Sequence, residues 1–479
     1  MGGMGQQIAG VSRAAWERLI AKLDALSGVH SLVVMRAGTV VAEAHWAPYL
    51  AEQPQMLFSA TKTFTAFAIG CLIAEGKLQL HDAVIDLLPA AAPAKPSRKL
   101  QNMQVKHLLT MTTGHETEPK LKTGNWAKSI LKHPVKLEPG SKFLYNSMAS
   151  HLLSVIVTKL TGQKLIDYLI PRLFEPLGIA VGGEGGATWE QDPQGNNTGG
   201  WGLALRPMDL AKFGQLLLQR GTWEGRQLVP AEWVDAMMAR QVDTTASRGV
   251  TDWTAGDWAH GYGYQMWRCS VDAARADGAF GQFSVVWPQH GAVITITAGA
   301  DMNGGTQAIL SAIWECLGSA FSELPAGASP SGASDQGKLD WAGTLPRPDG
   351  AASSPILDLV DSAPFQIEGT TGTVTVKRNG DLLEVAYSHP PAMTHVAAHG
   401  AWHRFSGVGP EGTRGPAASS YAWTTPNTLV LQTYGTATPF GWTHTLTFDD
   451  DDAASLTVRV DQNVSFGPGT ILNATARRV

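Results

Sequence analysis

A serine and a lysine three positions apart form the first pattern in this chain that could do chemistry. Ser59 and Lys62 stand as SxxK at the start of an apolar stretch. A serine hydroxyl is a weak nucleophile at neutral pH and needs a base, and a lysine can serve when burial lowers its pKa. Positions i and i+3 share one face of a helix, so both side chains would point into one cleft. The pattern predicts acyl transfer, with the N–H groups of the first helical turn near the developing oxyanion.

The same pattern occurs a second time, at Ser129 and Lys132. This copy lies in a short lysine-rich segment that ends before Pro134, where we expect the lysine to stay in water. The segment after Ser59 is long and apolar, so that Lys62 can be desolvated there. We therefore favour Ser59 as the nucleophile.

A buried helix is expected to carry Ser59 and Lys62. Apolar residues recur at intervals of three and four between Leu57 and Leu72, and Gly76 follows as a stop signal. The pattern predicts a helix that begins near Ser59.

Two hairpins at opposite ends of the first 324 residues indicate one shared sheet. Residues 30–46 carry an Ala37-Gly38 turn between two β-branched runs, and residues 281–299 carry two β runs around a turn at 288–291. Helical patterns precede the first hairpin and follow the second. Residues from about 100 to 245 show helical patterning broken by Gly and Pro turns. We predict an antiparallel sheet flanked by terminal helices, with a helical insert.

The length of the chain predicts two domains, because 479 residues exceed what one hydrophobic core usually supports. Residues 325–355 are rich in Pro, Gly, Ala and Ser, which indicates a linker. Residues 356–479 alternate apolar and polar side chains, and Asn379-Gly380 supplies a tight hairpin turn. We predict an α/β domain over residues 1–324 and a smaller all-β accessory domain, a barrel or sandwich, over residues 356–479.

The composition argues against several classes of partner. Hydrophobic residues at 44% and charged residues at 16% are typical of a soluble globular protein. A net charge of -5 gives no broad positive field, so we expect no nucleic-acid partner and no membrane. The N-terminus has no export-signal pattern. Cys71, Cys269 and Cys316 form no CxxC pair, so neither disulfides nor a cysteine metal site are predicted and a cytoplasmic location fits.

No cofactor or metal ion is expected. His395, His399 and His403 recur every four residues, which on a helix would suggest a metal-binding face. Gly400 and the β pattern favour three unrelated histidines on strands or loops. The acidic run Asp449–Asp452 lacks the spaced ligands of a calcium loop and is typical of a solvated turn. A GxSxG nucleophile elbow is absent from the sequence, which argues against an α/β-hydrolase triad.

Four segments resemble, in order and spacing, the penicillin-recognising serine hydrolases: class C β-lactamases, D-alanyl-D-alanine peptidases and related esterases and amidases. They are MLFSATKTFTAFAIGCLIAEGKLQLHD, VKHLLTMTTGH, LEPGSKFLYNSMASHLLSVIVTKLTG and GGWGLALRPMDLAKFGQLLLQRGTW. The resemblance covers roughly residues 25–320. It implies a β-lactamase-like fold for the first domain and a tight turn near the cleft at residues 199–202.

The resemblance also implies roles for individual residues. The family's nucleophile falls on Ser59, its helix lysine on Lys62, and the tyrosine of its YxN element on Tyr145. The asparagine of that element is Ser147 here, whose hydroxyl can still bond Lys62 or a substrate carbonyl. Lys62 and Tyr145 would share the removal of the Ser59 proton, and the same pair would activate water to release the acyl group. Which of the two is the base stays open.

The third family element, a basic residue followed by Thr and Gly on a strand edge, is matched best by Ala276-Asp277-Gly278. Gly278 fits a strand whose backbone must approach a ligand. The N–H of Ala279, together with that of Ser59, would form the oxyanion hole. We count these residues with Ser147 as candidates for oxyanion and substrate binding.

The missing basic side chain at position 276 bears on the substrate, because in the family that side chain helps bind the substrate carboxylate. Arg275 is one place away and would point to the opposite face of the strand. This departure favours uncharged esters or amides over penicillins and peptidoglycan stems. Asp277 could attract a cationic amine, or it could pair with a local donor such as Arg275.

Together these features predict a cytoplasmic serine hydrolase that cleaves an ester or amide of a small molecule through an acyl-enzyme on Ser59. One alternative is a β-lactamase or a D-amino-acid-specific peptidase or amidase of the same fold. Another is a catalytically silent binding protein whose β domain contacts a partner. The sequence gives no oligomeric state.

Overall fold

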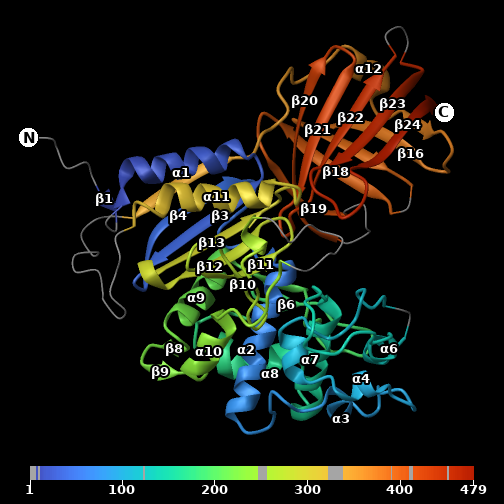
Figure 1. Cartoon of the computed structure of the whole chain (residues 1–479). Helices are drawn as coiled ribbons and strands as arrows, with labels where there is room; N and C mark the ends of the chain where they lie inside the picture. The colour runs from blue at the N-terminus through green and yellow to red at the C-terminus, as the bar shows by residue number, and fades with distance from the viewer. Residues whose placement is uncertain are drawn as a thin grey trace, which may run out of the picture.

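The computed structural model describes residues 7–8, 11–121, 124–245, 256–321, 338–389, 391–408, 414–449 and 453–479. Within these residues the chain forms a mixed α/β domain and an all-β barrel that lies beside it (Figure 1). The two larger hydrophobic cores of the first domain lie on either side of its sheet, and the barrel has a core of its own.

The described part of the first domain is built on a seven-stranded sheet in the order β10-β11-β12-β13-β3-β4-β14. Its strands are β3 (Val29–Arg36), β4 (Thr39–Ala47), β10 (Trp267–Arg268), β11 (Ala274–Gly278), β12 (Gln282–Trp287), β13 (Ala292–Ala298) and β14 (Leu339–Thr344). Antiparallel pairing of β13 with β3 joins the two predicted hairpins in one sheet, which confirms that expectation.

Helices cover both faces of this sheet. On one face lie the two terminal helices, α1 (Arg13–Ala25) and α11 (Gly305–Leu317), side by side as predicted (Figure 1). On the other face α9 (Pro207–Leu218) packs on β13, β12 and β3. Gly214 permits this close packing, because a Cβ there would lie 2.5 Å from the Ser284 Oγ.

The predicted helical insert packs below α9 and around the central helix α2 (Thr61–Ala74) (Figure 1). Besides α9, its helices are α4 (Arg98–Gln101), α5 (Val105–Leu109), α6 (Trp126–Lys132), α7 (Ser147–Thr161), α8 (Leu165–Leu169) and α10 (Ala231–Met238), and the short helix α3 (Val84–Leu87) lies between α2 and this insert in the sequence. Every residue of α2 from Thr61 to Leu72 is buried, as the apolar pattern predicts.

Short elements complete the first domain. The pairs β1 (Gln7–Ile8) with β2 (Val11–Ser12) and β8 (Thr222–Trp223) with β9 (Arg226–Gln227) form small ribbons, and β5 (Gln55–Met56), β7 (Leu203–Leu205) and β6 (Thr188–Trp189) form a three-stranded sheet. The single turns are η1 (Phe58–Ala60), η2 (Ile170–Phe174), η3 (Gly256–Trp258) and η4 (Pro288–His290).

The stretch predicted as a linker, residues 325–355, contributes a strand to the first domain. Its part up to residue 337 lies outside the described residues. Beyond it, β14 pairs in parallel with β4 at the sheet edge. Trp341 packs against Trp46 with ring centroids 4.7 Å apart. The apolar patch from Leu339 to Trp341 therefore belongs to the sheet, which the Gly- and Pro-rich surroundings concealed.

The second domain is a closed β-barrel. Of the two predicted alternatives, a barrel or a sandwich, the barrel is correct. Its strands are β15 (Pro364–Ile367), β16 (Thr373–Asn379), β17 (Leu382–Tyr387), β18 (Met393–His399), β19 (His403–Val408), β20 (Arg414–Thr425), β21 (Thr428–Gly435), β22 (Gly441–Phe448), β23 (Ser455–Gln462) and β24 (Thr470–Arg478), preceded by α12 (Ile356–Val360). Parallel pairing of β18 with β20 closes nine of these strands, and β19 pairs with β20 beside that closure.

The histidines and the acidic run that the sequence analysis considered as metal sites lie on strands of the barrel or between two of them in the sequence. His395 and His399 lie on β18 and His403 begins β19. Residues 450–452 of the acidic run lie outside the described residues. Among the described helices, none has both the length and the apolarity that crossing a bilayer requires.

Candidate active site

Ser59 lies on the turn η1, immediately before α2. The prediction placed it in the first turn of an α-helix, whereas the structure begins α2 at Thr61 and gives Ser59 a 3-10 turn of its own. The preceding residue, Phe58, has φ 47°, a left-handed conformation that an L side chain rarely adopts. This bend comes before α2, and Ser59 lies half-buried on the wall of a pocket.

Lys62 is buried directly behind Ser59, with 1% of its surface exposed. Its Nζ donates hydrogen bonds to the Ser59 Oγ at 2.7 Å, the Ser147 Oγ at 3.1 Å and the Gly200 carbonyl at 2.7 Å. Burial lowers the pKa of Lys62 to about 7, and the charges of Glu118 and Asp277 oppose that shift. The amine is thus poised to exchange a proton near neutral pH.

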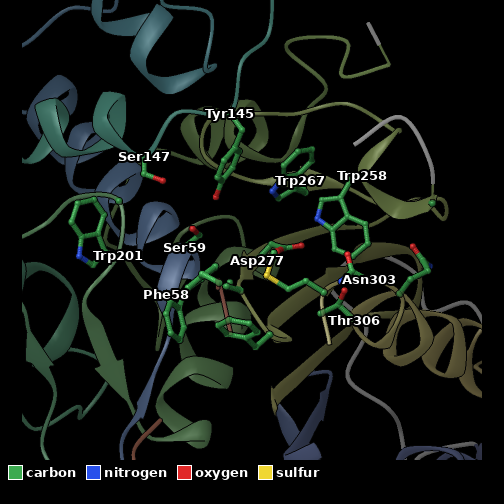
Figure 2. A pocket seen from close by; sticks show the side chains of 18 of the residues that line it. Phe58, Ser59, Tyr145, Ser147, Trp201, Trp258, Trp267, Asp277, Asn303 and Thr306 are labelled. Carbon is green, nitrogen blue, oxygen red and sulfur yellow. The ribbon is translucent and has the colours of Figure 1, made fainter. Parts of the chain in front are cut away.

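Tyr145 reaches the same point from the segment before α7. Its ring centroid lies 4.8 Å from the Lys62 Nζ, and Trp267 stacks on the ring at 5.7 Å. Figure 2 shows the hydroxyl ends of Tyr145 and Ser59 pointing toward one another. Burial raises the pKa of Tyr145 far above its usual value, although its hydrogen bond with Ser59 acts in the opposite direction. The phenol is therefore neutral at physiological pH.

Asn146, between Tyr145 and Ser147, is the N-cap of α7. Its Oδ1 accepts from the N–H groups of Met148 and Ala149, so that it caps α7 and makes Ser147 the first helical residue. The sequence analysis assigned no role to this position. Asparagine directly before a helical pattern was the signal that could have revealed it.

Glu118 is a site residue that the sequence analysis missed, and Gly200 lies in the turn that the resemblance placed near the cleft. The Glu118 carboxylate accepts from the Ser147 N–H at 2.6 Å, and Gly200 supplies the carbonyl that binds Lys62. A Cβ at Gly199 would lie 2.2 Å from the Ser150 carbonyl oxygen, and one at Gly200 would lie 2.6 Å from that of Ser147. The glycines thus let this turn lie against α7 and reach the lysine.

Gly278, the last residue of β11, lies against the nucleophile turn. A Cβ there would come within 2.1 Å of the Leu57 carbonyl oxygen and 3.2 Å of the Ala60 nitrogen. Glycine is needed here for this close approach of two backbones. The contact places Ala279 and Ser59 on the wall of one pocket, as a shared oxyanion site requires.

Asp277 pairs with Arg275, one of the two alternatives that the sequence left open. The Arg275 Nε donates to the Asp277 Oδ2 at 2.8 Å, and the arginine side chain is fully buried. Burial raises the pKa of Asp277, and the pairing with Arg275 opposes the rise. Ala276 is buried on the other face and brings no basic group to the site.

The pocket in front of Ser59 has a volume of about 730 Å³, and seven of the described residues that line it are aromatic. The described residues that line it include two acidic side chains and no Lys, Arg or His. Figure 2 shows several of its rings around Ser59. The aromatic residues that line the pocket are Phe58, Tyr145, Trp201, Trp258, Trp267, Phe280 and Phe466. Such walls suit an apolar and uncharged ligand better than an anion.

The second SxxK copy lies apart from this pocket. Ser129 and Lys132 belong to α6, where the Ser129 Oγ donates to the Asn125 carbonyl at 3.0 Å and Lys132 is exposed. The described part of the chain brings no three His, Cys, Asp or Glu side chains together as a metal site.

Residues 16–301 match the family model described as Beta-lactamase. An Escherichia coli K12 relative, named "Putative D-alanyl-D-alanine carboxypeptidase", is 28% identical over 170 residues, which are 31% of this chain and 39% of that protein. The 6-aminohexanoate-dimer hydrolase of Paenarthrobacter ureafaciens is 23% identical over 226 residues, 44% of this chain and 57% of that protein. The chain therefore spans less than two thirds of the length of these curated relatives.

The likeness to a solved structure extends over both domains. The octameric penicillin-binding protein homologue from Pyrococcus abyssi superposes with a TM-score of 0.50 at 16% identity, covering 97% of this chain and 99% of that chain. An identity this low shows a shared fold alone.

Proposed function

The chain belongs to the beta-lactamase family, whose members are serine hydrolases, and we propose that it cleaves an uncharged ester or amide of a small molecule through Ser59. The predicted family and the β-lactamase-like fold are confirmed. The observation that carries the proposal is the buried Lys62 amine, 2.7 Å from the Ser59 Oγ, with a pKa lowered to about 7.

Lys62 acts as the base of acylation in this proposal. At neutral pH a large fraction of the amine is unprotonated and can take the Ser59 proton while the Oγ bonds to the substrate carbonyl carbon. The N–H groups of Ser59 and Ala279 hold the oxyanion. Tyr145 is neutral, so it donates its proton to the leaving oxygen or nitrogen and recovers one from the protonated Lys62.

Hydrolysis of the acyl-enzyme repeats these transfers in reverse. Water gives up a proton to the Lys62 and Tyr145 pair as its oxygen attacks the acyl carbon. Ser59 takes that proton back when its bond to the acyl group breaks. The cycle releases one acid and one alcohol or amine, and the protein returns to its starting protonation.

The substrate class follows from the pocket walls. The aromatic rings favour apolar groups, whereas Glu118 and Asp277 oppose a substrate carboxylate. The name of the Paenarthrobacter relative, a hydrolase of 6-aminohexanoate dimers, supports cleavage of an amide bond, whereas the absence of charge in the proposed substrate rests on the pocket walls alone.

Labelling with a fluorophosphonate, followed by mass mapping of peptides, tests the nucleophile. We expect one adduct, on the peptide that contains Ser59. It should disappear in Ser59→Ala and persist in Ser129→Ala, the matched control from the second SxxK copy. An unlabelled native protein would favour the silent binding protein, and an adduct on Ser129 would contradict the assignment.

Rates on three substrates test the proposed class. We expect a nitrophenyl ester to be cleaved faster than a cephalosporin, because the described pocket walls offer no cation for the cephalosporin carboxylate. The rate on a D-amino-acid amide tests the alternative of a D-amino-acid-specific peptidase or amidase, which predicts that this substrate is cleaved fastest. A cephalosporin rate above the ester rate would reverse this order of substrates.

A further inference from the structure

Phe466 is an exposed aromatic residue of the barrel that lines the pocket of the first domain. It lies between β23 and β24, more than 400 positions from Ser59 in the sequence, and 69% of its surface is exposed. An apolar group of a bound ligand that covered this ring would remove apolar surface from water, which is favourable.

The rings that Phe466 contacts flank the predicted oxyanion groups. Its centroid lies 4.7 Å from that of Phe280, which follows Ala279, and 5.9 Å from that of Phe58, which precedes Ser59. Phe440, also from the barrel, contacts the same two rings at 5.7 Å and 6.1 Å. One aromatic cluster thus joins the barrel to both sides of the site.

Hydrogen bonds hold the barrel in this position. The connection between β21 and β22 binds the segment just before the nucleophile turn: the Met56 N–H donates to the Ala437 carbonyl at 2.9 Å, and the Gln55 Nε2 donates to the Thr436 carbonyl at 2.7 Å. The Tyr49 hydroxyl donates to the Thr438 carbonyl at 3.0 Å.

The loop that carries Phe466 is tied to that connection and to the first domain. The Asn463 Nδ2 donates to the Pro439 carbonyl at 2.9 Å, and the Gly441 N–H donates to the Asn463 Oδ1 at 2.6 Å. A Cβ at Gly299 would lie 2.4 Å from the Pro439 carbonyl oxygen and 2.9 Å from the Asn463 Nδ2. The backbone at Gly299, directly after β13, therefore packs closely against these two barrel loops.

We propose that Phe466 is a specificity-determining residue, which holds an apolar group of the substrate against Phe58 and Phe280. The barrel is then part of the substrate site, because it supplies one wall of the pocket. This inference rests on the proposed function. It extends that function by naming the class of group selected, an alkyl or aryl substituent on the acyl carbon or on the leaving group.

Two fluorophosphonates that differ in the length of their alkyl chain test the proposal, because phosphonylation of Ser59 needs no complete turnover. We expect Phe466→Ala to slow labelling by an octyl probe about tenfold or more, and labelling by an ethyl probe less than about twofold. Ile471→Ala is the matched control, since Ile471 is an exposed apolar residue of the same barrel, outside the pocket lining. It should change neither rate.

A second variant separates the loss of an apolar contact from a general disturbance of the fold. Phe466→Leu keeps an apolar side chain and should retain part of the preference for the octyl probe, and an unchanged circular dichroism spectrum shows that each variant is folded. If Phe466→Ala labels Ser59 with an unaltered ratio of the two rates, the barrel selects no apolar group and the inference is wrong. If neither probe labels Ser59 of the native protein, the proposed function itself fails.

Discussion

Arg275 and Asp277, two residues apart on β11, form a buried ion pair at the edge of the pocket. The Arg275 Nε lies 2.8 Å from the Asp277 Oδ2, and the arginine also donates to the Asp257 carbonyl at 3.1 Å. Alternate residues of a strand share a face, so the two side chains meet while Ala276 points away. The carboxylate that could have received a cationic substrate is thus already paired.

Asp277→Asn should destabilise the protein, because it leaves the Arg275 charge buried without its partner. We expect a loss of about 3–5 kcal/mol in the free energy of unfolding, measured with urea. Asp272→Asn is the control, since its ion pair with Arg268 is exposed and should contribute little. If Asp277→Asn instead keeps full stability and raises KM for cationic amides alone, Asp277 binds the substrate amine.

Lys62→Ala should slow acylation strongly without unfolding the protein. Removal of a general base lowers rates by about 10²- to 10⁴-fold, and we expect a loss in this range for phosphonylation of Ser59. Lys132→Ala, from the second SxxK copy, should react at the native rate because Lys132 is exposed on α6. Near-native labelling of Lys62→Ala would exclude this lysine as the base.

The acylation rate should rise with pH through about 7, because only the neutral Lys62 amine accepts the Ser59 proton and its pKa is lowered to about 7. Below that pH the rate should fall about tenfold per pH unit. Measurement of kcat/KM for an ester from about pH 5 to about pH 9 checks this fall of the rate on the acidic side of the pH profile. A flat profile down to pH 5 would contradict the assignment.

Asp277→Asn offers an independent check on the pH at which the acylation rate falls to half. The negative charge of Asp277 raises the pKa of Lys62, so its removal should move the midpoint to lower pH. Asp272→Asn should leave the midpoint in place, because Asp272 lies on the exposed side of its ion pair. A midpoint that moves to higher pH, or not at all, would show that Asp277 does not act on the base.

The side chains of the candidate site could be predicted because their types are chemically distinctive and two of them are neighbours in sequence. Ser59 and Lys62 are one helical turn apart, so local structure alone brings them together. Tyr145 lies on another segment, and its place could be inferred only from the resemblance to a family. The hairpins were readable for the same local reason, since a turn and two flanking β runs lie next to one another.

The remaining parts depend on tertiary packing, which leaves little mark on local sequence. Gly200 acts through its backbone carbonyl, which every residue has, and Glu118 stands in an irregular segment without a pattern. The strand β14 lies in a stretch rich in Gly, Pro, Ala and Ser, so its apolar patch could not be distinguished from a linker. Phe466 joins the pocket only because the barrel is seated against the first domain.

Gly278→Ala should impair catalysis by separating β11 from the nucleophile turn. Its Cβ would meet the Leu57 carbonyl oxygen at 2.1 Å, so one of the two backbones must move. Loss of one oxyanion donor costs about 10²- to 10³-fold in kcat, and we expect a decrease of this order with KM less affected. Gly415→Ala, on a strand where an added Cβ meets nothing within 4 Å, is the matched control and should keep native kinetics. The added Cβ moves β11 relative to Ser59, so the N–H of Ala279 would leave its position beside the oxyanion. A native kcat in Gly278→Ala would therefore mean that Ala279 supplies no oxyanion donor.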